Sequence, residues 1–119
     1  MMPSGKYYIG DLCYVMHPQW SEFCDLTISG DCVKNGEFEL SNGVRFAAYS
    51  TMYGDGGYKD EDGRTYHVDA GLIGCILLDD IEDPDAKITG GQIIEFTEPF
   101  ETSEEDGLIS FGDIRIDTE

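Results

Sequence analysis

Positive charge is scarce in this chain. Of its 119 residues, 7 are Lys or Arg and 25 are Asp or Glu, so the formal net charge is −18 at pH 7. A charge of this size keeps a protein soluble and repels nucleic acid and anionic membrane surfaces. The imbalance argues against direct nucleic-acid or membrane binding, and it favours a partner protein with a basic surface.

Long apolar runs and histidine clusters are also missing. No stretch approaches the ~18 apolar residues that a membrane span requires, and residues 1–6 lack the apolar core of a signal peptide. We therefore expect a cytoplasmic protein. The two histidines, His17 and His67, are too few for a multi-histidine metal site. We expect no metal and no cofactor.

The cysteines form no CxxC pair. Cys13, Cys24, Cys32 and Cys75 lie among apolar neighbours or near expected element ends, which is typical of free, buried thiols. Cys24 and Cys32 are close enough in sequence for a local disulfide, and this alternative stays open.

The chain is expected to form one domain over residues 1–119. It has no linker, low-complexity run or fixed-period repeat, and with 40% hydrophobic residues it can bury one core. Residues 6–9 and 13–16 are rich in Tyr, Ile and Val and predict strands. Residues 17–26 predict the one helix, because Pro18 suits a first turn and Trp20, Phe23 and Cys24 fall on one helical face.

Turn residues predict the remaining strands. Asn42-Gly43 separates alternating runs at 36–41 and 44–49, which predicts a hairpin with a type I′ turn. A second hairpin is predicted at 57–59 and 64–68, a central strand apolar on both faces at 72–78, and further strands at 92–97, 108–111 and 114–116. The expected fold is mainly β (α+β), an antiparallel small barrel or sandwich of about eight short strands with one helix capping an open end.

A glycine-rich segment offers the main case for an enzyme or a ligand-binding domain. Residues 53–58 hold three glycines around Asp55, and such a backbone can approach a ligand closely. Asp11, Asp55, Asp69 and His67 are the candidate catalytic residues, with paired carboxylates as acid and base. Turn formation and capping of strand ends explain these aspartates without catalysis, so we favour the structural interpretation.

One further motif begins like a calcium loop. Asp60-x-Asp62-Gly63 lacks the third aspartate and the final glutamate of such a loop. A hairpin turn explains these residues better.

Acidic residues are densest in residues 79–85. If this segment is extended at about 3.3 Å per residue, its five acids span about 20 Å. Their charge density is then close to that of a DNA strand, which carries one phosphate per ~3.4 Å. Nucleic-acid mimicry is one interpretation, and a solvated or salt-adapted acidic surface is the other. The acids expected to contact a partner are Asp79, Asp80, Glu82, Asp83, Asp85, Glu101, Glu104, Glu105 and Asp106.

Three segments together resemble a group of small uncharacterised proteins of phages and bacteria. These are GKYYIGDLCY at residues 5–14, STMYGDGGY at 50–58 and VDAGLIG at 68–74, and the resemblance covers most of residues 5–75. The chain departs from that group at Leu12, where proline is expected, and at Ala70, where serine is expected. The group implies no activity.

Size, charge and this resemblance lead to one principal hypothesis. By analogy with small acidic phage proteins, the chain is expected to be a non-enzymatic inhibitor, similar to anti-CRISPR or anti-restriction proteins, of a basic nucleic-acid-binding protein in the host cytoplasm. The alternative is the small enzyme or ligand-binding domain described above. A third possibility is a structural module, which a large apolar patch and a stable homo-oligomer would indicate. The sequence does not predict an oligomeric state.

Overall fold

A computed structural model describes residues 2–29, 32–33, 35–51, 56–68, 71–81 and 90–118. Short strands dominate it, with one α-helix and three 3-10 helices among these residues. In chain order the elements are β1 (Gly5–Gly10), η1 (Leu12–Tyr14), η2 (His17–Gln19), α1 (Trp20–Thr27), β2 (Ile28–Ser29), β3 (Cys32–Val33), β4 (Gly36–Glu39), β5 (Arg45–Ser50), β6 (Gly56–Asp60), β7 (Thr65–Val68), β8 (Leu72–Leu77), η3 (Leu78–Asp80), β9 (Gln92–Phe96), β10 (Thr102–Glu105), β11 (Leu108–Phe111) and β12 (Ile114–Asp117).

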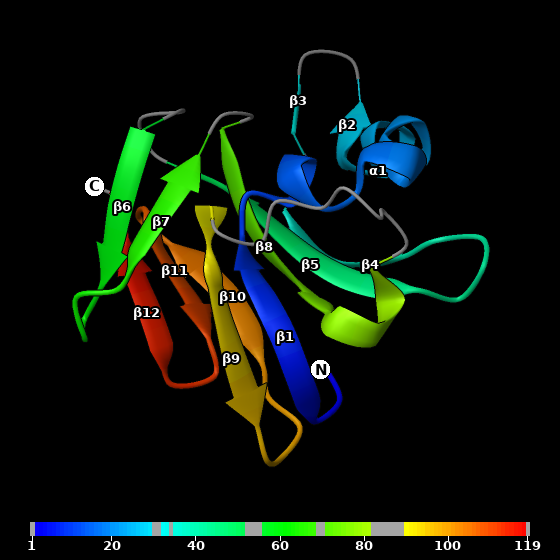
Figure 1. Cartoon of the computed structure of the whole chain (residues 1–119). Helices are drawn as coiled ribbons and strands as arrows, with labels where there is room; N and C mark the ends of the chain where they lie inside the picture. Colours follow the sequence, from blue (N-terminus) through cyan, green and yellow to red (C-terminus); the bar gives the residue numbers. More distant parts are fainter. Residues whose placement is uncertain are drawn as a thin grey trace.

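Two five-stranded antiparallel sheets form the body of the protein (Figure 1). The first has the order β4-β5-β8-β1-β9 and the second the order β10-β11-β12-β6-β7, while β2 and β3 make a separate ribbon. Within the described residues, no strand of the first sheet pairs with a strand of the second. The mainly β, antiparallel expectation is confirmed, and the architecture is sandwich-like.

Alternation along the strands of the first sheet produces two cores. On β1, Tyr7 and Ile9 face the second sheet, where they join Tyr66, Phe111 and other buried side chains in one cluster. Tyr8, between them in sequence, points to the opposite face and joins a second cluster. The first sheet is therefore the middle of three layers.

The strand β8 is apolar on both faces, as predicted for a central strand. Ile73 and Cys75 belong to the core between the sheets, and Leu72 and Ile76 to the core on the other face. Because period-2 alternation sends neighbours to opposite faces, a strand covered on both sides must be apolar at every position.

The predicted helix is present and covers the outer face of the first sheet, not the end of a barrel. Pro18 lies in η2, immediately before α1. Phe23 stacks on Trp20 with ring centroids 4.4 Å apart and on Phe46 of β5 at 5.0 Å. No helix in the described ranges is long and apolar enough to cross a membrane.

The strand predicted at residues 13–16 is wrong, because the chain turns there into η1. The side chain of Asp11 accepts a hydrogen bond from the backbone N–H of Cys13 at 2.9 Å and so caps this short helix. The turn lets Leu12 and Val15 pack, fully buried, against the first sheet. The apolar composition of the segment reflects this packing.

The cysteines are free thiols where the structure describes their side chains. Cys75 is buried, whereas Cys13 and Cys24 are half-buried and not fully buried as expected. Because Cys24 is a free thiol, it does not form the local disulfide with Cys32 that the sequence left open.

The β4–β5 hairpin is confirmed, but its turn is not type I′. Gly43 has a φ of +91°, while Asn42 keeps a negative φ and accepts a hydrogen bond from the N–H of Val44 at 3.1 Å. Gly43 donates to the Leu40 carbonyl at 2.9 Å, and Leu40 donates to the Val44 carbonyl at 2.8 Å. This pattern is typical of a longer loop with a left-handed glycine. The β6–β7 hairpin and the strands β9, β11 and β12 also form as predicted.

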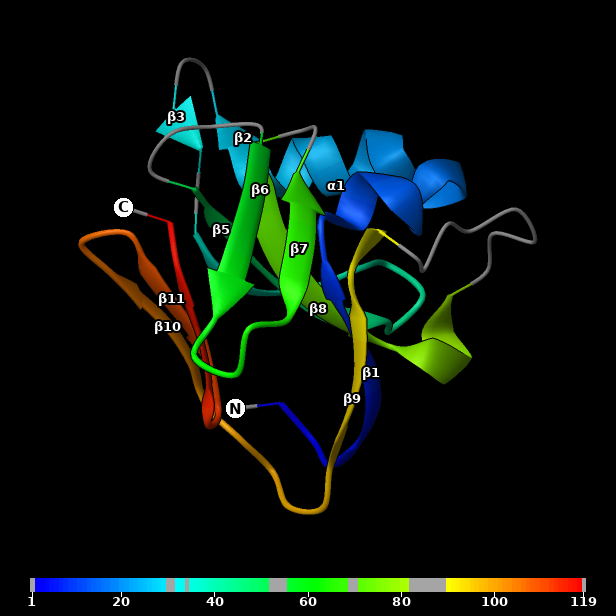
Figure 2. The same cartoon turned by 60° about the vertical axis from the view of Figure 1, so that its left-hand side comes forward.

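Side chains bridge the two sheets along both sides of the sandwich. On one side Gln92 of β9 donates to the Thr65 carbonyl of β7 at 3.0 Å. On the other, Thr102 of β10 donates to Glu37 of β4 at 3.1 Å and lies 2.6 Å from the hydroxyl of Tyr49. Because the one hydroxyl hydrogen of Thr102 goes to Glu37, Tyr49 donates to Thr102. In Figure 2 the connection from β9 to β10 crosses from the first sheet to the second at the bottom of the view.

Candidate functional site

An open groove of about 620 Å³ lies where the chain crosses between the sheets. One wall is the segment from the end of β9 to the start of β10, residues 95–101, and the other comes from β10, β11 and β12. Both sheets therefore contribute to the groove.

Aromatic rings form the base of this groove. Phe96 and Phe100 both line it and stack on each other with centroids 3.8 Å apart. The ring of Tyr7 meets each of them edge-on, at 5.6 Å and 5.0 Å. Phe100 is nearly buried, and Phe96 remains half-buried.

Gly112 packs closely against these rings. A Cβ on Gly112 would lie 3.1 Å from Phe96 and 3.2 Å from Phe100. Its φ of +60° also belongs to the tight turn between β11 and β12, where glycine at the first loop position is favoured. The same residue thus satisfies the turn and lets its backbone pack against the two rings.

The rim of the groove is strongly acidic. Glu98, Glu101 and Asp113 line it, are exposed, and make no ion pair or side-chain hydrogen bond with the residues that the structure describes. Glu95 also lines it and lies opposite Lys6 in the β1–β9 register. Among the described residues of the lining, Arg115 is the single cation.

Arg115 ends a polar row across the second sheet. It lies opposite Ser110 of β11, which in turn lies opposite Ser103 of β10, and both serines line the groove. The guanidinium of Arg115 is 3.7 Å from a carboxylate oxygen of Glu61, outside the groove. The lining therefore combines carboxylates and hydroxyls with an aromatic base, a set that suits a cationic guest.

The predicted acidic segment 101–106 is divided by its secondary structure. Glu101 lines the groove, and Glu105 is exposed further along β10. Glu104 accepts a hydrogen bond from the N–H of Gly107 at 2.8 Å, and Asp106 has a φ of +51° in the turn to β11. At about 3.3 Å per residue, Glu101 and Glu105 are ~13 Å apart along the strand. The contact of these acids with a partner stays a prediction.

The other acidic segment is not an extended chain where it is described. Asp79 and Asp80 lie in η3, a single 3-10 turn. Glu82, Asp83 and Asp85 lie outside the described residues. The estimate of five charges along an extended strand therefore does not apply to Asp79 and Asp80.

The candidate catalytic residues do not lie in the groove where they are described. Asp11 is fully buried and caps η1, and its backbone carbonyl accepts a hydrogen bond from the Tyr8 hydroxyl at 3.0 Å. His67 is exposed on β7, opposite Gly57. Asp55 and Asp69 lie outside the described residues, so the expected convergence with Asp11 stays a prediction.

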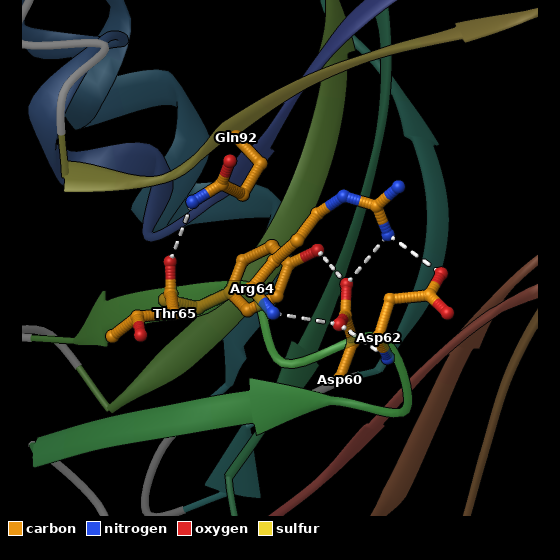
Figure 3. A network of polar contacts seen from close by, with 6 residues as sticks. Asp60, Asp62, Arg64, Thr65 and Gln92 are labelled. Carbon is orange, nitrogen blue, oxygen red and sulfur yellow. Dashed lines mark hydrogen bonds and ion pairs between the residues drawn. The ribbon is translucent and has the colours of Figure 1, made fainter.

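A second polar site, not predicted from the sequence, surrounds Asp60 at the β6–β7 turn (Figure 3). Its carboxylate accepts hydrogen bonds from the N–H of Asp62 and the N–H and guanidinium of Arg64, at 2.9, 2.9 and 3.1 Å, and from the Tyr66 hydroxyl at 2.7 Å. Burial alone would raise the pKa of Asp60, but these bonds together lower it. The residues that resemble the start of a calcium loop thus serve the hairpin turn.

Two classes of site lack support in the described part of the chain. No group of three or more His, Cys, Asp or Glu there has the geometry to hold a metal ion. Ile93 and Leu108 are the exposed large apolar side chains among these residues, and they lie on different sheets. They form no contiguous patch of the kind that the structural-module hypothesis requires.

Comparison of the chain with protein-family models, with curated proteins and with solved structures found no match in any of the three.

Proposed function

We propose that this chain is a non-enzymatic, acidic interaction protein that binds a basic surface of another protein in the groove between β9 and the β11–β12 turn. The observation that carries the proposal is the set of uncompensated carboxylates of Glu98, Glu101 and Asp113 around a concave surface. A cationic partner would supply the missing counter-charges.

The arginines of the chain are already used within the fold. Arg45 pairs with Glu37 at 3.3 Å, Arg64 with Asp60 and Asp62 at 3.1 and 3.0 Å, and Arg115 with Glu61 at 3.7 Å.

The net charge of the chain adds a longer-range attraction to that of the groove carboxylates. At −18, the chain attracts a basic partner over about one Debye length, ~10 Å at 0.1 M salt. Opposite potentials accelerate encounter and help to select the partner.

Proteins that bind nucleic acid present basic surfaces of the required kind. A chain that occupies such a surface would compete with nucleic acid and so inhibit its partner, which is the phage-type, anti-defence form of the proposal. That form rests on analogy. It does not depend on phosphate mimicry, since a cationic surface is attracted by carboxylates without a matching spacing.

A basic peptide carrying a neutral dye provides a direct test. We expect fluorescence anisotropy to detect binding that weakens as salt rises. The groove variant Glu98→Gln/Asp113→Asn should weaken binding by about tenfold, since each lost charge-assisted contact is worth roughly 0.5–1 kcal/mol at an exposed site. The control Asp25→Asn/Glu39→Gln makes the same change in net charge on α1 and β4, away from the groove.

Three outcomes would overturn the proposal. Absence of binding at low salt would remove its basis. An equal loss in both variants would mean that net charge, and not the groove, attracts the peptide. A loss confined to Asp79→Asn/Asp80→Asn would place the contact at residues 79–85 and contradict the assignment to the groove.

A further inference from the structure

We infer that the groove recognises an arginine side chain of its partner, with the ring of Phe96 as the stacking surface. This inference rests on the proposed function and adds the chemical identity of the bound group.

The first reason is the aromatic base. Binding by net charge alone needs only carboxylates on a surface, yet here Phe96 is half-buried and lines the acidic groove. Phe100 and Tyr7 support its ring by stacking and edge contacts. A cation over an aromatic ring is attracted by the quadrupole of the ring. Phe96 thus offers a held platform inside a negative potential.

The second reason is the shape of the guanidinium group. It is planar, stacks on aromatic faces and is less strongly hydrated than the ammonium of lysine. Its five N–H donors can reach several acceptors at once. Glu98, Glu101 and Asp113 supply carboxylates around the base, and Ser103 and Ser110 supply hydroxyl oxygens.

Arg115 allows a second, independent test of the inference. Its positive charge lines the same groove that should receive a guanidinium, and like charges repel. Arg115→Gln should therefore strengthen binding of a cationic guest, in contrast to the carboxylate substitutions.

The test compares two neutral-dye peptides of equal length and charge, one with arginine and one with lysine as its cations. We expect the native chain to bind the arginine peptide about two- to fivefold more tightly, which corresponds to a cation–π contribution at an exposed site. Phe96→Leu should abolish this preference, and Phe96→Tyr should retain it. Glu98→Gln/Asp113→Asn should weaken binding of both peptides. Urea unfolding of each variant would verify that it folds.

The outcomes separate the two proposals. Equal affinity for both peptides would overturn this inference and leave the proposed function standing, as would an arginine preference that survives in folded Phe96→Leu. If Phe96→Leu does not fold, loss of the preference in Phe96→Tyr would overturn the inference. Failure of both peptides to bind the native chain would overturn the proposed function itself.

Discussion

Replacement of Asp60 by asparagine should be the most destabilising polar substitution in the β6–β7 hairpin. The carboxylate of Asp60 is nearly inaccessible, with 2% of its side chain exposed, and it accepts hydrogen bonds from four donors. Asparagine keeps the volume and one oxygen, which can still accept from the backbone. Its NH₂ group replaces the other oxygen and faces two donors, the Arg64 guanidinium and the Tyr66 hydroxyl.

The cost can be estimated from these contacts. Tyr66 is fully buried, so water cannot replace its bond to the carboxylate, and a hydrogen bond to a charged group contributes roughly 1.5–3 kcal/mol. The ion pair with Arg64 adds only about 0–1 kcal/mol, because 37% of the Arg64 side chain is exposed. We expect Asp60→Asn to lower the free energy of unfolding by about 1.5–4 kcal/mol.

Urea unfolding at neutral pH measures this change. The control is Asp62→Asn, whose side chain is 72% exposed and accepts a hydrogen bond from Arg64. It should change the free energy of unfolding by less than about 0.5 kcal/mol. In the double variant with Tyr66→Phe, the two costs should not add, since both remove the same bond. A cost below about 1 kcal/mol for Asp60→Asn would refute the assignment of the stabilisation to the Tyr66 bond.

The pH dependence follows from the lowered pKa of Asp60. A carboxylate whose pKa is lower in the folded state stabilises the fold above its unfolded pKa, about 3.9 for aspartate, and loses that effect as the pH falls through the folded value. The difference between native chain and Asp60→Asn should therefore be constant near neutral pH and shrink below about pH 4. A difference that grows on acidification would contradict this sign.

Three other substitutions or reactions test the packing of the sandwich. Gly74→Ala should destabilise the fold by about 2–3 kcal/mol, because a Cβ there would lie 2.2 Å from the Ala47 carbonyl oxygen, whereas the control Gly57→Ala meets nothing within 4 Å and should not destabilise it; equal urea midpoints would be contrary to this expectation. Thr102→Val should cost about 1–2 kcal/mol in urea unfolding, since the hydroxyl links the sheets, and an unchanged midpoint would argue against that link. Burial raises the pKa of the Cys75 thiol, so peptide mapping after treatment with a thiol reagent should find Cys75 unmodified in the folded protein and modified in urea.

Local patterns in the sequence predicted much of the fold. The run of apolar residues in β8, the hairpin around Asn42-Gly43 and the strand predicted at residues 92–97 are all found. In each case the signal lies within a few residues and follows from the period of a strand or the chemistry of a turn.

Other elements depend on contacts that a local pattern does not contain. The apolar segment after Asp11 becomes a 3-10 helix because a capping bond and the face of the first sheet decide its conformation. The strand β10 has the sequence TSEE, which carries little strand propensity, and its pairing with β11 follows from the Asp106-Gly107 turn.

The residues of the groove were likewise only partly predictable from local sequence patterns. Glu101 was identified by its place in an acidic segment, whereas Phe96, Glu98 and Asp113 were not, because they belong to separate stretches of the sequence. Proline and phenylalanine between Glu98 and Glu101 were the available local sign of an unusual connection. The convergence of that connection with the β11–β12 turn is a long-range property of the two sheets.

Salt should act in opposite directions on stability and on binding. A net charge of −18 is held within 36 × 33 × 26 Å, and these dimensions exceed the Debye length of ~10 Å at 0.1 M salt. Repulsion between the acidic residues is greater in the folded chain than in the expanded unfolded chain. Added salt screens this repulsion and should therefore raise the free energy of unfolding in urea. The same screening should weaken a basic peptide in the groove. If salt instead lowered the free energy of unfolding, the ion pairs of Arg45, Arg64 and Arg115 would outweigh the repulsion. The excess of acidic residues would then not destabilise the fold, and a basic partner could not stabilise the fold by relieving repulsion.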